Sequence, residues 1–336
     1  MAKRLTKRIV TVGGGTGHFT LLRGLRTVCS RVTAVVSMMD SGGSSGRLRD
    51  EYGILPPGDF TRCLVALSEH PETMRSLLGH RFKGGSLDGH TLRNLLFTAL
   101  EQMTGSTAET VRRLHQVFQV RGRVLPVSLE RCDLVMNLED GRTVRGEANI
   151  DTLAGILDAP VLNVYADPVV SGYGEALDAL RQADVIVLGP GDLYTSVIPN
   201  LLVDRVPEAI VSSRALVIYV ANLMTKPNET HGYTVRDFTS AVELHLGRPR
   251  IDVVLYHSGK LPRSEYGAYA AANSHPVELG DVSSWRRGTR FIGREIAVYK
   301  PFVRHDARRL AGAIQACIES AQPAPRVSAG EPTAQS

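Results

Sequence analysis

The sequence predicts an α/β protein with a Rossmann-like, mostly parallel sheet that carries helices on both faces. Three observations support this prediction. Short apolar runs rich in β-branched residues alternate with segments of helical periodicity along most of the chain. Several of these runs end in glycine-bearing turns, the place where open α/β sheets bind ligands. With 336 residues, 43% of them hydrophobic, the chain can bury a sheet on both faces.

The order of the elements follows from the local pattern. Continuous apolar runs predict buried strands at residues 9–12, 32–39, 160–165, 185–188, 216–220, 251–256 and, near the end, 296–299. Apolar positions three to four residues apart predict the covering helices at 19–30, 174–182, 194–211, 234–246 and 307–321. Pro199 interrupts the third of these helices, and Asp306 is placed to cap the start of the last one.

Two insertions interrupt the parallel pattern. The first, about residues 59–120, carries four helical segments at 60–68, 72–78, 91–103 and 108–118, and we expect it to form one wall or lid of a pocket. The second, about residues 123–150, has apolar runs on both sides of an Asp-Gly pair, which is typical of a tight hairpin turn. We therefore expect a single domain over residues 1–321 and a disordered tail at 322–336, which is rich in Pro, Ala, Ser and Gly.

Composition and charge exclude several classes of protein. The net charge of +5 comes without a long basic run interleaved with aromatic residues, so nucleic acid is not expected as a main partner. The four cysteines are scattered singly, which predicts neither a zinc site nor a disulfide framework. No stretch of about 18 apolar residues predicts a membrane span. We expect a cytoplasmic protein whose mildly basic charge suits an anionic small molecule.

Two glycine-rich turns, each directly after one of the first two strands, predict a phosphate site. The residues of the two turns are Gly13, Gly14, Gly15, Thr16 and Gly17, and then Asp40, Gly42, Gly43, Ser44, Gly46 and Arg47. Successive backbone N–H groups at the start of a helix form a ready site for an anion. The first turn has His18 where a dinucleotide fingerprint requires its third glycine, and it lacks the lysine of a P-loop. An NAD-dependent oxidoreductase and an ATP-hydrolysing enzyme are therefore disfavoured.

Three polar groups near these turns allow two interpretations each. In one interpretation, Asp40 binds a ribose or sugar hydroxyl, holds a magnesium ion or acts as a base. In the other, it only closes an Asx-turn onto the backbone near Gly42. Asp59, after Pro-Pro-Gly, either lines the pocket or caps the helix that follows it. His90 and Asn94 share one helix face, where such a pair is either functional or a satisfied packing contact.

Further candidate binding residues lie later in the chain. Gly189 and Gly191 form a third glycine-bearing turn at the end of a strand, where Asp192 follows them. Asn222 and Thr225 end the next strand and are placed to contact a base or a sugar. The remaining candidates near the end are Tyr266, Tyr269 and Arg304, and arginine is the natural partner of a phosphate.

Taken in order, these motifs resemble the gluconeogenesis factor (YvcK-like) family within the CofD-like superfamily, over about residues 8–319. Pro56-Pro57-Gly58-Asp59, a hairpin containing Glu147, Glu229-Thr230 and Arg304-His305-Asp306 complete the set. The resemblance implies a Rossmann-like nucleotide-binding domain with extra helices. The YvcK-like branch binds UDP-sugars, notably UDP-N-acetylglucosamine, and is tied to cell shape, wall-precursor supply and growth on gluconeogenic carbon sources. The CofD branch transfers a phospholactyl-type group from a guanosine diphosphate adduct.

The resemblance also implies roles for single residues. The turns at 13–17 and 42–46 would cradle the diphosphate, and Asn222 and Thr225 would lie along the nucleotide. Tyr269 and Arg304 would hold the far end of the sugar nucleotide, with Tyr266 as the weaker candidate for the tyrosine. Asp40 would lie where the transferase branch has its acid and its magnesium.

Three positions depart from the family pattern. Arg93 stands where relatives usually have glycine, Asp192 replaces a common serine, and His18 is unusual. Arg93 would either crowd the face of His90 and Asn94 or add positive charge to the pocket.

The sequence therefore predicts a regulatory protein that binds a UDP-sugar, requires no cofactor, and passes its state to protein partners or enzymes. Self-association of the chain stays open. The alternative is a transferase of the CofD type, in which Mg²⁺ would take part.

Overall fold

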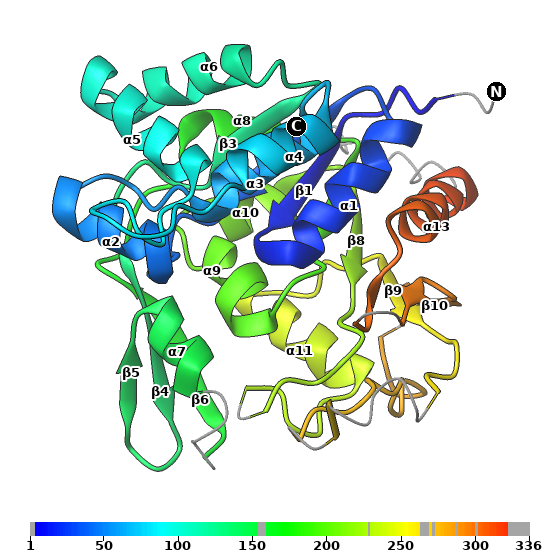
Figure 1. Ribbon diagram of the computed structural model, residues 1–336. Helices are drawn as coiled ribbons and strands as arrows, with labels where there is room; N and C mark the ends of the chain where they lie inside the picture. Colours follow the sequence, from blue (N-terminus) through cyan, green and yellow to red (C-terminus); the bar gives the residue numbers. More distant parts are fainter. Residues whose placement is uncertain are drawn as a thin grey trace, which may run out of the picture.

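The computed structural model describes residues 4–153, 159–227, 229–262, 269–270, 273–286, 288–299 and 302–321 (Figure 1). Its centre is a seven-stranded sheet in the order β10-β9-β8-β7-β1-β2-β3, and all of its neighbouring strands are parallel. The strands are β1 (Ile9–Gly13), β2 (Val32–Val36), β3 (Arg123–Pro126), β7 (Val185–Leu188), β8 (Leu216–Val220), β9 (Val253–His257) and β10 (Arg290–Arg294). The predicted Rossmann-like α/β fold is confirmed.

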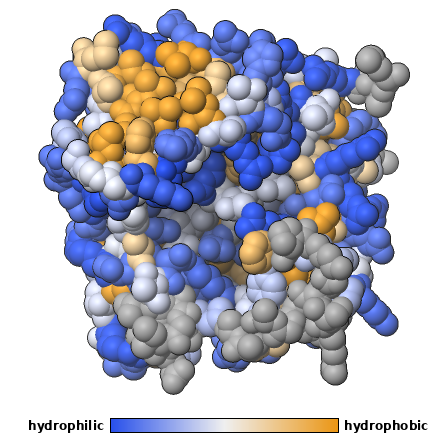
Figure 2. All heavy atoms as spheres, in the orientation of Figure 1, coloured by the Kyte–Doolittle hydropathy of each residue, from blue (hydrophilic) through white to orange (hydrophobic). Residues whose placement is uncertain are grey.

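The predicted helical insertion forms helices beside and above this sheet. They are α3 (Gly58–Leu67), α4 (Pro71–Leu78), α5 (Leu92–Thr104) and α6 (Thr107–Val117). Figure 2 shows a broad apolar area in the region of α5, whereas most of the remaining coloured face is polar. No helix in the described ranges is long and apolar enough to cross a membrane.

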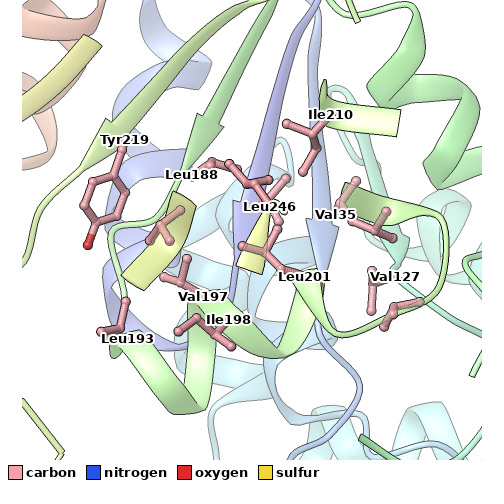
Figure 3. Close-up of a cluster of buried hydrophobic side chains, with 14 of the residues drawn as sticks. Val35, Val127, Leu188, Leu193, Val197, Ile198, Leu201, Ile210, Tyr219 and Leu246 are labelled. Atoms are coloured by element: carbon pink, nitrogen blue, oxygen red, sulfur yellow. The ribbon is translucent and has the colours of Figure 1, made fainter. Parts of the chain in front are cut away.

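The sheet is buried on both faces because its strands alternate between two apolar cores. Val10 and Val12 of β1 belong to the core under α8 (Gly174–Arg181), α9 (Ile198–Leu201), α10 (Val206–Ser212) and α11 (Val235–His245), part of which Figure 3 shows. Ile9 belongs to the opposite core, under α1 (Gly15–Val28), α3, α6 and α13 (Ala307–Ser320). Burial of both faces explains why these strands read as continuous apolar runs.

A topological switch point lies between β1 and β7. These two strands are neighbours, but the chain continues from β1 to β2 and β3 on one side, and from β7 to β8, β9 and β10 on the other. The loops that follow β1 and β7 therefore diverge at the carboxyl edge of the sheet. Such a divergence leaves a crevice where open α/β sheets bind their ligands.

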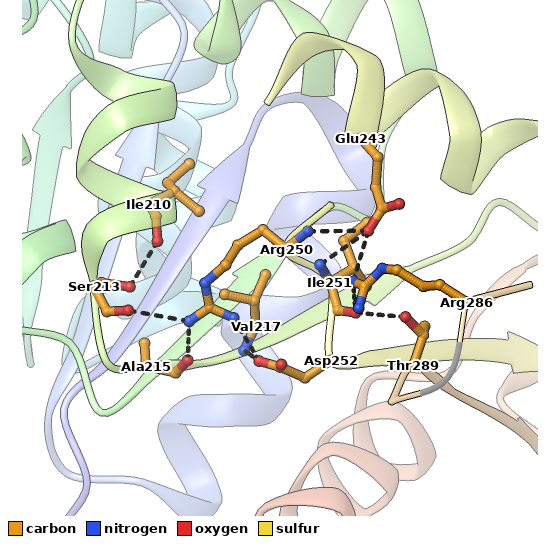
Figure 4. A network of polar contacts seen from close by, with 10 residues as sticks. All are labelled: Ile210, Ser213, Ala215, Val217, Glu243, Arg250, Ile251, Asp252, Arg286 and Thr289. Atoms are coloured by element: carbon orange, nitrogen blue, oxygen red, sulfur yellow. Dashed lines mark hydrogen bonds and ion pairs between the residues drawn. The ribbon is translucent and has the colours of Figure 1, made fainter. Parts of the chain in front are cut away.

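A network of polar contacts holds the other end of the sheet (Figure 4). The Arg250 guanidinium donates to the carbonyl oxygens of Ser213 and Ala215 and pairs with Asp252. The Glu243 carboxylate of α11 accepts from the backbone N–H of Arg250. These contacts tie α11 to the amino ends of β8 and β9, away from the crevice.

Three predictions about strands are wrong. The run at 160–165 belongs to β6 (Val161–Asp167), which pairs antiparallel with β4 (Asp133–Leu138) in a separate sheet that also holds β5 (Thr143–Arg145). An apolar run does not specify its sheet, and Leu162 of β6 is in fact 62% exposed. Residues 123–126, expected in the hairpin excursion, form β3 of the main sheet.

The strand expected at 296–299 contains β11 (Ala297–Val298), which pairs antiparallel with β12 (Arg304–His305) outside the main sheet. The main sheet ends instead at β10, which was not predicted.

The helix predictions need three corrections as well. The second glycine turn opens an unpredicted helix, α2 (Gly43–Tyr52), and Glu147 begins α7 (Glu147–Leu153) instead of lying in a hairpin strand. The helix expected at 194–211 is divided into a π-helical turn, η1 (Leu193–Val197), followed by α9 and α10. Pro199 lies in the first turn of α9, where a missing N–H costs nothing.

Asp306 caps α13 as predicted. The tail at 322–336 lies outside the described residues.

A side chain at Gly24 should destabilise the fold, because α1 and α13 approach each other there. A Cβ at Gly24 would lie 2.1 Å from the carbonyl oxygen of Ala307. We predict that Gly24→Ala lowers the free energy of unfolding by about 1–3 kcal/mol, the usual cost of overpacking. The measurement is urea unfolding followed by circular dichroism.

The matched control is Gly312→Ala on α13, where a Cβ would meet nothing within 4 Å. It should be neutral or stabilising by up to about 1 kcal/mol. Equal unfolding midpoints for the two variants would contradict the close approach.

Candidate functional site

A pocket of about 270 Å³ lies at the switch point, at the carboxyl ends of β1, β7 and β8. Its lining comes from the first glycine turn, the turns after β7 and β8, and the segment around β12. The lining residues are Gly14, Gly15, Thr16, Gly17, Thr20, Pro190, Gly191, Asp192, Ser196, Asn222, Leu223, Met224, Tyr269, Val303, Arg304 and His305. Segments far apart in the sequence therefore meet at one point.

The first glycine turn presents the start of α1 to this pocket. Gly14 is the N-cap residue and offers no side chain to the first N–H groups of the helix. Gly15 has a φ of +67°, which favours glycine. A Cβ at Gly17 would lie 2.6 Å from the carbonyl oxygen of Pro190, so only glycine lets α1 approach the turn after β7. The glycines of this turn are explained by backbone geometry and by close packing.

His18 supports the turn from behind. It is fully buried, and its Nε2 lies 2.7 Å from the Thr11 hydroxyl. Burial lowers the pKa of His18 to about 4, so the imidazole is neutral. The unusual residue at this position is therefore one that packs in the core and does not line the pocket.

The Asp59 side chain binds one of the free backbone N–H groups at the start of α1. Its Oδ2 accepts the backbone N–H of Gly15 at 2.7 Å, and its Oδ1 pairs with Arg62 at 3.3 Å. Asp59 lies inside α3 and makes no cap for that helix, so the interpretation as the N-cap of its own helix is wrong. Burial raises the pKa of Asp59, and the nearby Asp40 adds to this effect.

Asp40 closes the Asx-turn, as one of its two interpretations predicted. Its Oδ1 accepts the backbone N–H of Gly42 at 2.9 Å. Glu147, at the start of α7, faces the same region. Burial raises the pKa of Glu147 to about 8, with further contributions from the charges of Asp40, Asp151 and Asp59. Three carboxyl groups from α3, α7 and the second glycine turn therefore share one region.

The second glycine turn lines a different hollow, together with Arg81 and the loop at 88–89. Its lining residues are Ser41, Gly43, Ser44, Gly46, Arg47, Asp50, Arg81, Asp88 and Gly89. Both turns lie on one edge of the sheet, at the ends of the neighbouring strands β1 and β2. The Asp59 carboxyl group lies beside Gly14 of the first turn, and the Asp40 carboxyl group lies beside Gly42 of the second turn. In this conformation each turn lines its own hollow, and the single diphosphate cradle made by both turns stays a prediction.

His90 and Asn94 hold the start of α2. His90 is 6% exposed and Asn94 is 2% exposed. The Asn94 amide donates to the hydroxyls of Ser44 and Ser45, and His90 Nδ1 lies 3.2 Å from the Ser44 hydroxyl. The packing interpretation of this pair therefore describes the structure.

Arg93 adds positive charge beside the carboxyl groups. Burial lowers the pKa of Arg93 to about 10, and the neighbouring Arg62 and Arg81 act in the same direction. Its buried Nε has no hydrogen-bond partner among the described residues.

The wall opposite α1 contains both candidate and unpredicted residues. Arg304 lines the pocket and stacks over Phe302 at 5.3 Å, and the Tyr269 hydroxyl accepts the backbone N–H of Val303. Asn222 Oδ1 and His305 Nε2 are buried and have no hydrogen-bond partner among the described residues. His305 appeared in the sequence only as a neighbour of Arg304, so no signal singled it out.

Two predicted residues lie just outside this lining. The Thr225 hydroxyl accepts the backbone N–H of His275 at 2.9 Å, so Thr225 fixes a loop. Gly189 has a φ of +74° and shapes the turn that carries Gly191 into the pocket. Tyr266 lies outside the described residues.

Lys226 is a further residue that the sequence did not indicate. Its ammonium pairs with Glu229 at 2.6 Å and with Asp192 at 3.3 Å, and it also contacts Asp151 of α7. Glu229 is 4% exposed, and burial raises its pKa to about 7. The cluster joins the pocket turn at Asp192 to the small antiparallel sheet and its helix. A single lysine has no motif by which it could have been found.

Comparisons with known proteins identify relatives over most of the chain. The family profile described as 2-phospho-L-lactate transferase CofD matches residues 9–296. The putative gluconeogenesis factor of Nostoc sp. (strain PCC 7120) is 42% identical over 90% of this chain and 67% of its own length. The gluconeogenesis factor of Bacillus subtilis (strain 168) is 38% identical over 90% of this chain and 96% of its own length.

A solved structure has the same fold. The crystal structure of protein BH3568 from Bacillus halodurans superposes with a TM-score of 0.87 at 40% identity. The match covers 93% of this chain and all of that one.

The raised pKa of Glu147 predicts a pH dependence of stability. The folded chain holds a proton on this carboxyl group up to about pH 8, whereas an unfolded glutamate loses it near its usual value of about 4.3. The folded state therefore binds more protons in this window, and its stability falls as the pH rises through it.

We predict that Glu147→Gln removes part of this fall. Between pH 5.5 and 8.0 the free energy of unfolding of the wild type should drop by about 1–3 kcal/mol more than that of the variant. Urea unfolding at the two pH values measures the difference, with Glu139→Gln at an exposed position as the control. A parallel fall in wild type and Glu147→Gln would show that Glu147 ionises normally.

Proposed function

The chain belongs to the CofD family, and we propose that its pocket at the switch point binds a nucleotide sugar of the UDP-N-acetylglucosamine class. In this proposal the protein is a regulator that senses a precursor of the cell wall. It would link wall supply and cell shape to growth on gluconeogenic carbon sources. Relatives that carry the name gluconeogenesis factor, from Nostoc sp. and Bacillus subtilis, support this role.

The distribution of hydrogen-bond donors and acceptors around the pocket carries the proposal. The pocket lining includes the N–H groups of Thr16 and Gly17, which have no intrahelical partner, and the side chain of Arg304. Such donors suit phosphate oxygens. The same lining holds two buried atoms without a hydrogen-bond partner among the described residues, Asn222 Oδ1 and His305 Nε2. Burial lowers the pKa of His305 to about 4, so its ring is neutral, and Nε2 is an acceptor when Nδ1 carries the proton.

The two acceptors argue for a ligand with N–H or O–H groups. A buried acceptor without a partner costs about 1–3 kcal/mol. A buried acceptor that lacks a hydrogen-bond partner in the protein indicates that a ligand supplies one. A diphosphate sugar linked to a nucleoside supplies phosphate oxygens for the donors and imide or hydroxyl hydrogens for the acceptors.

A second candidate function, transfer of a phospholactyl-type group, is favoured by the carboxyl groups of Asp40 and Asp59 and by the description of the family profile. Magnesium does not fit this pair as it stands. Asp40 Oδ1 and Asp59 Oδ2 accept backbone N–H groups, and Asp59 Oδ1 faces Arg62. Across the described part of the chain, no three His, Cys, Asp or Glu side chains are arranged to hold a metal ion. We derive no step through magnesium.

Replacement of Arg304 should weaken binding of the nucleotide sugar. A hydrogen bond between an arginine and a phosphate contributes about 1.5–3 kcal/mol, so we predict that Arg304→Gln lowers affinity for UDP-N-acetylglucosamine roughly tenfold or more. Isothermal titration calorimetry measures this difference.

Arg308→Gln, at an exposed position outside the pocket lining, should bind like the wild type. Equal affinities for all three proteins would remove Arg304 from the site. Absence of binding to the wild type would contradict the proposal itself.

Incubation with labelled UDP- and GDP-linked donors separates the regulator from the transferase. We predict that the wild type returns the donors unchanged, as judged by mass spectrometry of the mixture. Product formation that Asp40→Asn abolishes would overturn the regulatory role and establish the transferase.

A further inference from the structure

Asp192, in the turn after β7, places a carboxylate in the lining of the pocket at the switch point. It directly follows the part of this turn that touches the start of α1. A Cβ at Gly17 would lie 2.6 Å from the carbonyl oxygen of Pro190 and 3.3 Å from the backbone nitrogen of Gly191. The free N–H groups at the start of a helix favour an anion, whereas a neighbouring carboxylate repels one. The pocket therefore combines an anion site with a side chain that works against a bare anion.

Local structure does not account for this carboxylate. Asp192 is the N-cap residue of the π-helical turn η1, a position where aspartate often accepts a backbone N–H group. Its side chain makes no such bond, and its backbone carbonyl oxygen instead accepts the N–H groups of Ser196 and Val197. The side chain is 50% exposed. Its position in the pocket lining is therefore not explained by the capping of η1.

Lys226 fixes one oxygen of the Asp192 carboxylate and leaves the other free. The Lys226 ammonium lies 3.3 Å from Asp192 Oδ2 and 2.6 Å from Glu229 Oε1, and it also contacts Asp151. Among the described residues, Asp192 Oδ1 accepts no hydrogen bond. Because one ammonium faces three carboxyl groups, the negative charge of Asp192 is only partly balanced. Oδ1 is therefore a charged acceptor that is available to a ligand.

A metal ion is not needed to explain why three carboxyl groups meet here. The Lys226 ammonium already lies where Asp151, Asp192 and Glu229 converge, so the cation of this cluster is a side chain of the protein. The free oxygen of Asp192 is left to interact with the ligand itself.

A sugar hydroxyl is the ligand group that suits such an acceptor next to a phosphate. Hydroxyl groups donate to a carboxylate in a charge-assisted bond, and in dinucleotide-binding folds a carboxylate about 20 residues beyond the glycine turn holds the ribose in this way. At the corresponding place this chain has Asp40, which binds the Gly42 N–H group through Oδ1 and lies outside the lining. Among the described lining residues, Asp192 is the only acid.

We propose that Asp192 makes the pocket select a diphosphate that carries a sugar over a bare diphosphate. Asp192 Oδ1 accepts a hydroxyl group of a sugar next to the diphosphate, and the negative charge repels phosphates that bring no such donor. Lys226 is a positioning residue, because it binds Oδ2 and thereby directs Oδ1 to the ligand. This inference rests on the proposed function and adds the residue that determines its specificity.

UDP-N-acetylglucosamine and inorganic pyrophosphate test the proposal, because Asp192→Ala should change their affinities in opposite directions. By isothermal titration calorimetry at low salt, the variant should bind UDP-N-acetylglucosamine about three- to tenfold more weakly, since the lost bond to a charged acceptor outweighs the relief of repulsion. It should bind pyrophosphate about fivefold more tightly, since only the repulsion is removed. A general loss of structure would weaken the binding of both ligands.

Two further variants make the result independent of this one substitution. Asp192→Asn keeps the size of the side chain, removes its charge and should also bind pyrophosphate more tightly than the wild type. Asp178→Ala is the matched control, because the Asp178 side chain on α8 is 66% exposed and pairs with Arg181 at 3.3 Å, outside the pocket lining. It should bind both ligands like the wild type. Circular dichroism verifies that each variant is folded.

The role of Lys226 is tested by rescue. Lys226→Met should bind pyrophosphate more weakly than the wild type, because Asp192 then lacks its balancing charge. The double variant Lys226→Met/Asp192→Ala should bind pyrophosphate more tightly than Lys226→Met. A lysine that only supported the fold would not be rescued in this way, so absence of rescue would contradict a role through Asp192.

UDP and 2′,3′-dideoxy-UDP, which lacks both ribose hydroxyls, identify the sugar that donates. If the ribose donates, Asp192→Ala weakens the binding of UDP but not that of the dideoxy compound. If the sugar beyond the diphosphate donates, the variant weakens the binding of UDP-N-acetylglucosamine alone. Both outcomes support the proposal.

Equal affinity of the wild type and Asp192→Ala for UDP-N-acetylglucosamine would overturn the inference, as would a change in the same direction for this ligand and pyrophosphate. In either case, binding of the nucleotide sugar to the wild type would still stand. Absence of binding of UDP-N-acetylglucosamine to the wild type would overturn the proposed function and this inference together.

Discussion

The close approach of the first turn of α1 to the turn after β7 is the constraint on which the site depends. A Cβ at Gly17 would collide with the carbonyl oxygen of Pro190. Because β1 and β7 are neighbours whose connections leave in opposite directions, this approach sets how closely the two walls of the crevice stand. It also directs the free N–H groups of α1 towards the acceptors near Asn222 and His305. The pocket is thus a consequence of strand order and of one small residue.

The sequence predicted the interior of the fold better than its edges. Central strands such as β1, β7 and β8 are buried on both faces, so their composition alone indicates them. The edge strands β3 and β10 were missed because they are short or partly exposed; β10 reads Arg-Phe-Ile-Gly-Arg and β3 ends in proline. The apolar run of β6 looked like a parallel strand, because partner choice depends on contacts distant in the sequence.

For the candidate site, the sequence located the first glycine turn, the turn after β7, Asn222, Tyr269 and Arg304, all of which line the pocket, whereas the second glycine turn lines a separate hollow. Local patterns could not indicate which carboxylate accepts a hydrogen bond from the start of which helix. Asp59 lies 44 residues from the Gly15 N–H group that it accepts, and its position in α3 resembled that of an ordinary cap. This long-range contact joins α3 to the start of α1.

A crystal structure of the protein with UDP-N-acetylglucosamine tests the central claim most directly. The account predicts the diphosphate against the N–H groups of Thr16 and Gly17 with Arg304 on its far side, and a hydrogen-bond donor of the ligand at Asn222. A ligand bound only in the hollow beside Arg47, with the crevice between β1 and β7 filled by the protein's own side chains, would contradict it.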